Sequence, residues 1–213
     1  MNKAVIFDVD GTLWDAVSVI TESWNITAKK HGITTVIKEE DMRPLMGKPM
    51  KDFAVLFPEL PQNEAVELLD ICCREEIDYI NEGHAGDLYD GMRETIEKLS
   101  EEYDLYIVSN CQVGYIESLL NSCNLNEYFE DFENYGRTGK SKGRNIRILM
   151  ERCDIDKAIY IGDTVTDMEA CMEAEVPFIL ADYGMGEVEY SRFVAKNPVD
   201  IPDVIKSMKY FSL

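Results

Sequence analysis

Ala4-Val5-Ile6-Phe7-Asp8-Val9-Asp10-Gly11-Thr12 lies near the start of this 213-residue chain and decides its fold. The apolar run is typical of a strand that is buried on both faces. It stops at two carboxylates that are one residue apart, where a turn residue would be expected. Like charges this close repel each other unless a cation or a shared proton intervenes. The stretch therefore predicts a buried strand that ends in a chemical site.

The same kind of short apolar run recurs further along the chain, at residues 105–108, 158–161 and 177–180. Between these runs, apolar residues are spaced as on one face of a helix. The stripes are Met92, Ile96, Leu99; Val113, Ile116, Leu120; Ile146, Leu149, Cys153; and Met168, Cys171, Met172. Alternating strands and amphipathic helices predict an α/β fold with a Rossmann-like parallel sheet.

Residues 16–86 interrupt this alternation with helical patterns only. One stripe contains Val17, Ile20 and Trp24, and a longer one runs from Val66 to Ile80. The Pro- and Gly-containing loops at residues 43–49 and 57–61 separate them. We therefore expect a small all-helical domain of residues 16–86, inserted after the first strand into an α/β core of residues 1–15 and 87–213.

Composition excludes several classes of protein. The net charge of −20 disfavours nucleic acid and anionic membranes as partners. No apolar run approaches the roughly 20 residues that span a bilayer, and no signal-peptide core precedes Asp8, so we expect a cytoplasmic protein. The six cysteines form no C-x-x-C pair and only two histidines are present, which argues for reduced thiols and against zinc.

Polar residues follow three of the predicted strands directly. They are Asp8, Asp10, Thr12, Ser109, Asn110, Asp163 and Asp167. Because the carboxyl ends of parallel strands share one edge of a sheet, we expect these side chains to converge in one crevice. Several carboxylates and no histidine or cysteine predict a hard cation with oxygen ligands, namely Mg²⁺. For Asp167, capping of the following helix through Thr164 is the alternative.

Two segments offer groups that bind anions. Ser109 and Asn110 supply a hydroxyl, an amide and backbone N–H groups at an expected helix start, although Ser109 could equally be an ordinary N-cap. Residues 136–144 carry four cations on a Gly-rich loop, a local reversal of charge whose alternative is a solvated turn. Paired carboxylates beside a metal and a phosphate pocket predict phosphoryl transfer through an aspartyl-phosphate. The absence of G-x-S-x-G argues against a serine hydrolase.

These residues together resemble the four motifs of the haloacid dehalogenase superfamily. The resemblance implies that Asp8 is the nucleophile and a metal ligand, and that Asp10 is the general acid/base and a metal ligand through its carbonyl. Thr12, Ser109 and Asn110 would bind the phosphoryl group, Asp163 would bind the metal, and Asp167 would support the site. The superfamily's lysine is usually followed by proline. Here Lys142, expected just before a helix of residues 145–153, is favoured over Lys140.

The resemblance also narrows the activity to a phosphatase, because dehalogenases lack the second aspartate of the motif. It implies a Mg²⁺-dependent enzyme of the phosphoglycolate-phosphatase-like group, with a helical cap, that hydrolyses a small phosphorylated metabolite. Arg43, Lys48 and Lys51 in the cap could reach a substrate anion, although simple surface placement is the alternative. A phosphomutase, a pyrophosphatase or a non-catalytic phosphate-binding relative stay open, as does the choice between monomer and homodimer.

Overall fold

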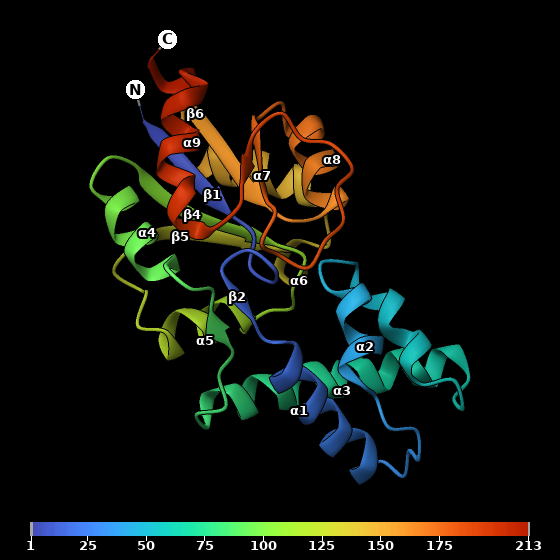
Figure 1. Ribbon diagram of the computed structural model, residues 1–213. Coiled ribbons are helices and arrows are strands. Elements are labelled where there is room, and N and C mark those ends of the chain that lie inside the picture. The colour runs from blue at the N-terminus through green and yellow to red at the C-terminus, as the bar shows by residue number, and fades with distance from the viewer. Residues whose placement is uncertain (1, 213) are drawn as a thin grey trace.

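The centre of the fold is a parallel sheet, and the computed structural model describes residues 2–212 around it (Figure 1). Within these residues the sheet has six strands in the order β5-β4-β1-β6-β7-β8, and every neighbouring pair is parallel. The strands are β1 (Lys3–Phe7), β4 (Asp104–Ser109), β5 (Phe129–Asn134), β6 (Lys157–Gly162), β7 (Phe178–Ala181) and β8 (Val194–Ala195). The predicted Rossmann-like α/β core is confirmed.

Strand β1 is apolar on both faces because helices cover both faces of the sheet. Val5 and Phe7 belong to a core that includes residues of α4 (Met92–Ser100) and α9 (Ile201–Met208). Ala4 and Ile6 belong to a second core with residues of α7 (Lys142–Arg152) and α8 (Val165–Ala174). The side chains of Ala4, Val5, Ile6 and Phe7 are fully buried. Burial of apolar area contributes about 25 cal/mol to stability for each Å² removed from water. The sheet is thus anchored at β1.

The chain reverses its direction across the sheet at β1. From β1 it proceeds to β4 and then β5 on one side, and it later returns to β6, β7 and β8 on the other. A crevice forms at such a switch point, outside the carboxyl ends of the strands. This topology places the ends of β1, β4 and β6 side by side.

The segment between β2 (Trp14–Asp15) and β3 (Asp87–Leu88), which pair antiparallel, is helical. We call this segment, residues 16–86, the helical insert. It contains α1 (Val17–Lys30), α2 (Glu39–Met42), α3 (Gln62–Asn81) and the 3₁₀ turns η1 (Arg43–Leu45) and η2 (Met50–Leu56). Figure 1 shows its helices beyond the end of the sheet where β1 leads into β2. Its limits as a separate domain stay a prediction.

Trp24 of α1 is central to the interior of the helical insert. It is 1% exposed and packs against Phe53 and Phe57, with ring centroids 5.6 Å and 6.4 Å away. Large aromatic side chains bury enough apolar area to hold short helices together that would not be stable alone.

No helix of the described residues is long and apolar enough to cross a membrane.

Several local expectations were wrong. Strands β5 and β8 were not predicted, because β5 reads Phe-Glu-Asp-Phe-Glu-Asn and lies at the edge of the sheet, where polar residues are tolerated. Val113 and Met172, expected in apolar stripes, are 54% and 74% exposed.

The remaining elements are α5 (Tyr115–Ser122), α6 (Tyr135–Thr138) and the 3₁₀ turns η3 (Pro198–Asp200) and η4 (Tyr210–Ser212).

Candidate active site

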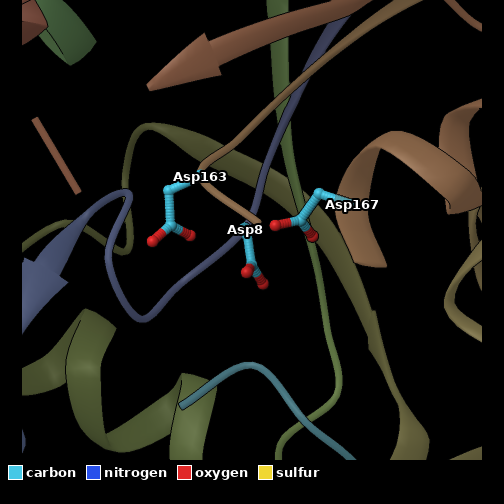
Figure 2. A group of neighbouring side chains, drawn as sticks. All are labelled: Asp8, Asp163 and Asp167. Carbon is cyan, nitrogen blue, oxygen red and sulfur yellow. The ribbon is translucent and has the colours of Figure 1, made fainter. Parts of the chain in front are cut away.

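Three carboxylates meet at the carboxyl ends of β1 and β6 (Figure 2). Asp8 follows β1, Asp163 follows β6, and Asp167 lies in the first turn of α8. Each contributes an oxygen to a group whose members lie within 4.8 Å of one another. All three residues are at most 1% exposed. The tertiary structure therefore brings together residues that are far apart in the sequence.

Lys142 is the cation among these carboxylates. Its Nζ lies 3.0 Å from Asp8 Oδ1 and 2.5 Å from Asp167 Oδ1, and its side chain is 1% exposed. Burial would lower the pKa of Lys142, but the carboxylates of Asp167 and Asp8 outweigh burial and hold it above its usual value. Lys142 thus stays charged in the interior. It offsets only part of the negative charge, since three acids face one lysine.

Asp167 is fully engaged within the protein. Its Oδ1 accepts hydrogen bonds from Lys142 and from Tyr160 Oη, the latter at 3.3 Å. Its Oδ2 accepts from the Thr164 backbone N–H at 3.0 Å and the Thr164 hydroxyl at 2.6 Å, which completes a capping box at the start of α8. Asp167 therefore caps α8 with one oxygen and contacts Lys142 with the other.

Asp8 and Asp163, by contrast, keep free oxygens. Asp163 Oδ2 accepts from the backbone N–H groups of Met185 and Gly186, at 2.8 Å and 2.9 Å. Asp163 Oδ1, Asp8 Oδ2 and the Thr12 hydroxyl are buried without a hydrogen-bond partner within residues 2–212. Buried polar atoms of this kind are rare in the absence of a ligand. Two orphaned carboxylate oxygens fit a hard divalent cation, and the hydroxyl fits a neighbouring phosphoryl oxygen.

Burial also raises the pKa values of these acids. The pKa of Asp8 is raised by burial and by the charge of Asp167, against the lowering effect of Lys142. Burial and Asp167 raise the pKa of Asp163 to about 6, although two backbone N–H donors lower it. Groups with strongly shifted pKa values in a crevice are typical of functional sites. A bound cation would reverse both shifts, because it favours the ionised carboxylates.

Two glycines allow the chain to approach Asp163 closely. Gly11 has a φ of +79°, and a Cβ there would lie 2.1 Å from Asp163 Oδ2. A Cβ at Gly184 would lie 2.2 Å from the carbonyl oxygen of Gly11. The sequence analysis missed the loop of residues 184–186. Gly184 and Gly186 lie near Asp163 in space but not in the sequence, so no local pattern pointed to them. Only glycine fits at either close approach.

Asp10 is oriented by two neutral donors. Its Oδ1 accepts from Tyr115 Oη at 2.7 Å and from Trp14 Nε1 at 3.2 Å. Burial raises the pKa of Asp10 to about 6, while these two hydrogen bonds lower it. Neither aromatic residue was predicted to act here, because both read as ordinary core residues. Tyr115 begins α5, more than one hundred positions after Asp10 in the chain.

The expected helix start at Ser109 and Asn110 was wrong. Helix α5 begins at Tyr115, after Gly114 in a left-handed conformation with a φ of 92°. Ser109 is therefore neither an N-cap nor part of a helix N-terminus. It ends β4, the strand next to β1, and is 4% exposed, while Asn110 Nδ2 donates to the Gly47 carbonyl of the helical insert at 3.0 Å. Asn110 thus connects the core to the insert.

The basic loop of residues 136–144 does not form a basic pocket. Residues 135–138 form the short helix α6, and α7 begins at Lys142 rather than after it, because the Ser141 hydroxyl caps its first turn. Arg137 stacks on Phe132 and pairs with Glu133 at 3.6 Å. Of the four cations, Lys142 alone is buried, whereas Lys140 is exposed. Only Lys142 contacts the carboxylates.

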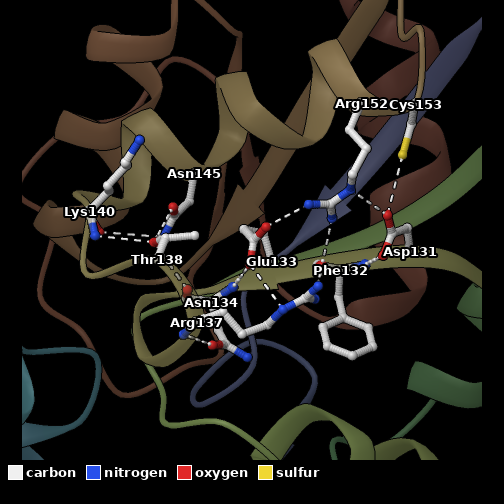
Figure 3. A network of polar contacts seen from close by, with 10 residues as sticks. All are labelled: Asp131, Phe132, Glu133, Asn134, Arg137, Thr138, Lys140, Asn145, Arg152 and Cys153. Carbon is white, nitrogen blue, oxygen red and sulfur yellow. Dashed lines mark hydrogen bonds and ion pairs between the residues drawn. The ribbon is translucent and has the colours of Figure 1, made fainter.

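A polar network beside the site holds the segment that leads into α7 (Figure 3). The Thr138 hydroxyl donates to Asn145 Oδ1 at 2.7 Å and accepts from the Lys140 backbone N–H at 3.1 Å. Asn134 caps α6 through Arg137, and both Asn134 and Asn145 are fully buried. The network ties β5 to the first turns of α7. It thereby fixes the backbone from which Lys142 extends.

The three basic residues of the helical insert have different surroundings. Arg43 pairs with Asp15 at 3.1 Å at the junction with the core. Lys48 is exposed and lines cavities between the insert and the core. Lys51 is exposed on η2 and lines neither of these cavities. Arg43 and Lys48 thus both line a cavity between the insert and the core, and Arg43 is in addition paired with Asp15.

Comparison with known proteins identifies the family. The sequence model of the haloacid dehalogenase-like hydrolases matches residues 5–181. A pyrophosphatase PpaX of Listeria monocytogenes is 28% identical over 179 residues, which is 80% of this chain and 79% of that protein. A phosphoglycolate phosphatase of Agrobacterium fabrum is 27% identical over 201 residues, or 88% of this chain and 84% of that protein.

A haloacid dehalogenase-like family protein from Streptococcus pneumoniae has the same fold. Its structure superimposes with a TM-score of 0.82 at 22% identity, covering 96% of this chain and 98% of that one. The chain belongs to the haloacid dehalogenase-like hydrolases. The predicted superfamily, fold class and hydrolase assignment are confirmed.

Proposed function

We propose that this haloacid dehalogenase-like hydrolase is a Mg²⁺-dependent phosphatase that cleaves the phosphomonoester of a small cytoplasmic metabolite through an aspartyl-phosphate on Asp8. One observation carries the proposal: Asp8 and Asp163 keep orphaned, buried carboxylate oxygens beside the equally orphaned hydroxyl of Thr12. These atoms are the complement of a divalent cation and a phosphoryl group. A dehalogenase would not need the second carboxylate at Asp10.

The proposed reaction has two steps. Asp8 attacks the phosphorus, the ester bond breaks, and Asp10 gives its proton to the leaving oxygen. Asp10 then takes a proton from water, whose oxygen attacks the phosphorus and releases inorganic phosphate and free Asp8. Asp10 suits both roles because Tyr115 and Trp14 hold one of its oxygens and leave the other free.

The surrounding residues bind and orient. Lys142 holds the Asp8 carboxylate at 3.0 Å and offsets the charge of the phosphoryl group. Thr12 and Ser109 would bind phosphoryl oxygens, together with Asn110 when its bond to the insert opens. Asp8, Asp163 and the carbonyl of Asp10 would hold Mg²⁺, which supplies positive charge to the transferring phosphoryl group. Asp167 has no free oxygen and supports Lys142.

The helical insert would act as a cap. Residues 16–86 lie beyond the carboxyl ends of the strands. Two contacts connect them to the core: Asn110 donates to the Gly47 carbonyl, and Arg43 pairs with Asp15. Such a cap excludes water from the phosphoryl-transfer site when it closes.

Hydrolysis of p-nitrophenyl phosphate with Mg²⁺ tests the proposal. We expect turnover that a chelator abolishes and Mg²⁺ restores. Lack of hydrolysis of every phosphomonoester in a metabolite panel would support the non-catalytic alternative. Faster cleavage of inorganic pyrophosphate than of all monoesters would favour the pyrophosphatase alternative, which the relative from Listeria makes worth testing. Transfer of label between sugar phosphates would instead identify a phosphomutase.

A further inference from the structure

A small cavity lies between the helical insert and the core, directly beside Asp10. Its volume of about 30 Å³ is room for roughly two water molecules. Asp10 and Tyr115 line it from the core, and Trp24, Phe53 and Glu76 line it from the insert. A substrate whose phosphoryl group lies at Asp8 would extend its leaving group past Asp10, the proposed proton donor, into this cavity. The residues that line this cavity should therefore be complementary to the leaving group of the substrate.

Glu76 is the charged group of the insert that faces this cavity from the interior. It comes from α3 and is 2% exposed. Trp24 Nε1 donates to its Oε2, and Gln112 Nε2 donates to its Oε1 at 2.9 Å. Within residues 2–212, no lysine, arginine or histidine forms an ion pair with Glu76. Both of its partners are neutral, so its charge is uncompensated.

An uncompensated buried carboxyl either stays protonated or acquires a cation. Burial, with a smaller contribution from the charge of Asp10, raises the pKa of Glu76 to about 8, although the hydrogen bonds from Trp24 and Gln112 lower it. Lys48 lines the same cavity but is exposed and forms no ion pair with Glu76. Among residues 2–212, the protein thus places no cation in an ion pair with Glu76.

The other walls of the cavity suit a cation as well. Trp24, Phe53 and Tyr115 present aromatic rings, and Trp24 and Phe53 lie 5.6 Å apart at an angle of 52°. The faces of such rings attract ammonium groups. A carboxylate combined with aromatic walls in a small cavity is complementary to a compact organic cation.

We infer that the substrate is a small phosphomonoester whose leaving group carries a positively charged amino group, which binds the Glu76 carboxylate inside the aromatic cavity. The inference rests on the proposed phosphatase function and specifies its substrate class. Glu76 is the specificity-determining residue, and Trp24 and Gln112 orient its carboxylate. The phosphoryl end binds at the sheet edge and the amino end binds in the insert.

Three isosteric substrates test the inference on the unmodified enzyme with Mg²⁺: aminoethyl phosphate, hydroxyethyl phosphate and n-propyl phosphate. Because a hydrogen bond to a charged group contributes about 1.5–3 kcal/mol, we expect kcat/KM for aminoethyl phosphate to exceed that for propyl phosphate at least tenfold. Equal or lower kcat/KM for the amino compound would overturn the inference. A preference for hydroxyethyl phosphate would also overturn it, in favour of a neutral Glu76 that binds hydroxyls.

Variants assign the preference to Glu76. In Glu76→Gln, the ratio of kcat/KM between aminoethyl and propyl phosphate should fall to near one. The matched control is Glu75→Gln, the neighbouring residue on α3 that pairs with Lys30 at the surface, which should keep the wild-type ratio. An unchanged ratio in Glu76→Gln would refute the assignment. Hydrolysis of p-nitrophenyl phosphate separates the failures: its absence overturns the phosphatase itself, whereas its presence without amino preference overturns only this inference.

Discussion

Asp8 at the sheet edge and Glu76 in the helical insert are both buried acids, but they are compensated in different ways. Asp8 lies 3.0 Å from the buried cation Lys142, whereas in the part of the chain that the structure describes Glu76 is bound by two neutral donors, Trp24 and Gln112, and by no cation. Lys142 lowers the pKa of Asp8 against burial and the charge of Asp167, and a cation bound at the sheet edge would favour the charged carboxylate further. The insert holds a carboxyl that becomes charged when a ligand brings a cation. In the proposed enzyme, the core would carry out phosphoryl transfer and the insert would select the substrate.

Removal of the charge on Asp8 tests the chemical half of the comparison most strongly. Asp8→Asn should reduce kcat on p-nitrophenyl phosphate by about 10³-fold or more, because the amide cannot act as the nucleophile. Steady-state kinetics measure the loss, and circular dichroism checks that the fold is retained. Asp203→Asn, an exposed change on α9, is the control. Near wild-type turnover in Asp8→Asn would exclude an aspartyl-phosphate on this residue.

Loss of the cation should affect stability as well as activity. Lys142→Met leaves Asp8 and Asp167 without their shared partner, which should lower the free energy of unfolding by about 3–5 kcal/mol. It should also reduce kcat/KM by about 10²-fold, since the phosphoryl charge is no longer offset. Urea unfolding and kinetics measure the two effects. Lys140→Met changes an exposed side chain, and a comparable loss of activity there would instead favour Lys140 as the phosphate-contacting lysine.

Binding of Mg²⁺ should stabilise the sheet edge. At a concentration about one hundred times its dissociation constant, the ion should contribute about 2.7 kcal/mol to the free energy of unfolding. The expected rise in Tm is about 5 °C or more for a chain of this length. Differential scanning fluorimetry with chelator and with Mg²⁺ measures it. Asp163→Asn should lose the shift, and an undiminished shift in that variant would contradict the proposed ligand set.

Glu76→Gln should have the opposite effect on stability from changes at the sheet edge. The pKa of Glu76 is raised to about 8 in the folded protein, above the usual 4.5. The folded state therefore binds a proton that the unfolded state has released, so this group's contribution declines as pH rises from about 5 to 8. The amide has no such penalty and should be more stable than wild type by on the order of 2 kcal/mol at pH 8.

Thermal unfolding at several pH values measures this difference. The advantage of Glu76→Gln should vanish near pH 5, where the wild-type carboxyl is protonated in the folded state. A constant difference across the range would mean that Glu76 does not titrate as its surroundings indicate. Ethanolamine, the alcohol that hydrolysis of aminoethyl phosphate would release, should stabilise the wild type and not the variant.

The smallest effect is expected at the neighbouring acid Glu75. Its partner Lys30 is 58% exposed, and solvent screens the pair. Hydrogen bonds from Lys30 and Thr27 lower the pKa of Glu75, so its contribution is present at neutral pH and declines as pH falls. Glu75→Gln should lower the free energy of unfolding by less than about 1 kcal/mol at pH 7. A larger loss, measured by urea unfolding, would show that surface pairs dominate the insert.

Much of the fold was predictable because its signals are local. The apolar run before Asp8 and the helical stripes after it predicted the parallel sheet, and the missing strands between residues 16 and 86 predicted the helical segment. Edge strand β5 escaped prediction because an edge strand need not be apolar on both faces. The start of α5 was misplaced because Gly114, and not Ser109, sets the turn before it.

The candidate site divides along the same line. Asp8, Asp163 and Asp167 were found in the sequence because each follows a predicted strand, whereas Lys142 was only favoured over Lys140. The structure brings the three acids together and places Lys142 in contact with Asp8 and Asp167. Glu76, Tyr115 and the loop at Gly184 were not found. Each acts through a partner that is distant in the chain, and its own sequence neighbourhood is that of an ordinary helix or turn.

The sequence by itself determined the α/β core, the family and the identity of the acids at the strand ends, because apolar periodicity and motif spacing are properties of the chain alone. Only the tertiary structure decided which oxygens remain free at Asp8 and Asp163, which lysine reaches Asp8, and that Glu76 forms no ion pair within residues 2–212. The physical reason is that compensation of a buried charge depends on distance in space, and the compensating groups come from segments that the chain keeps far apart.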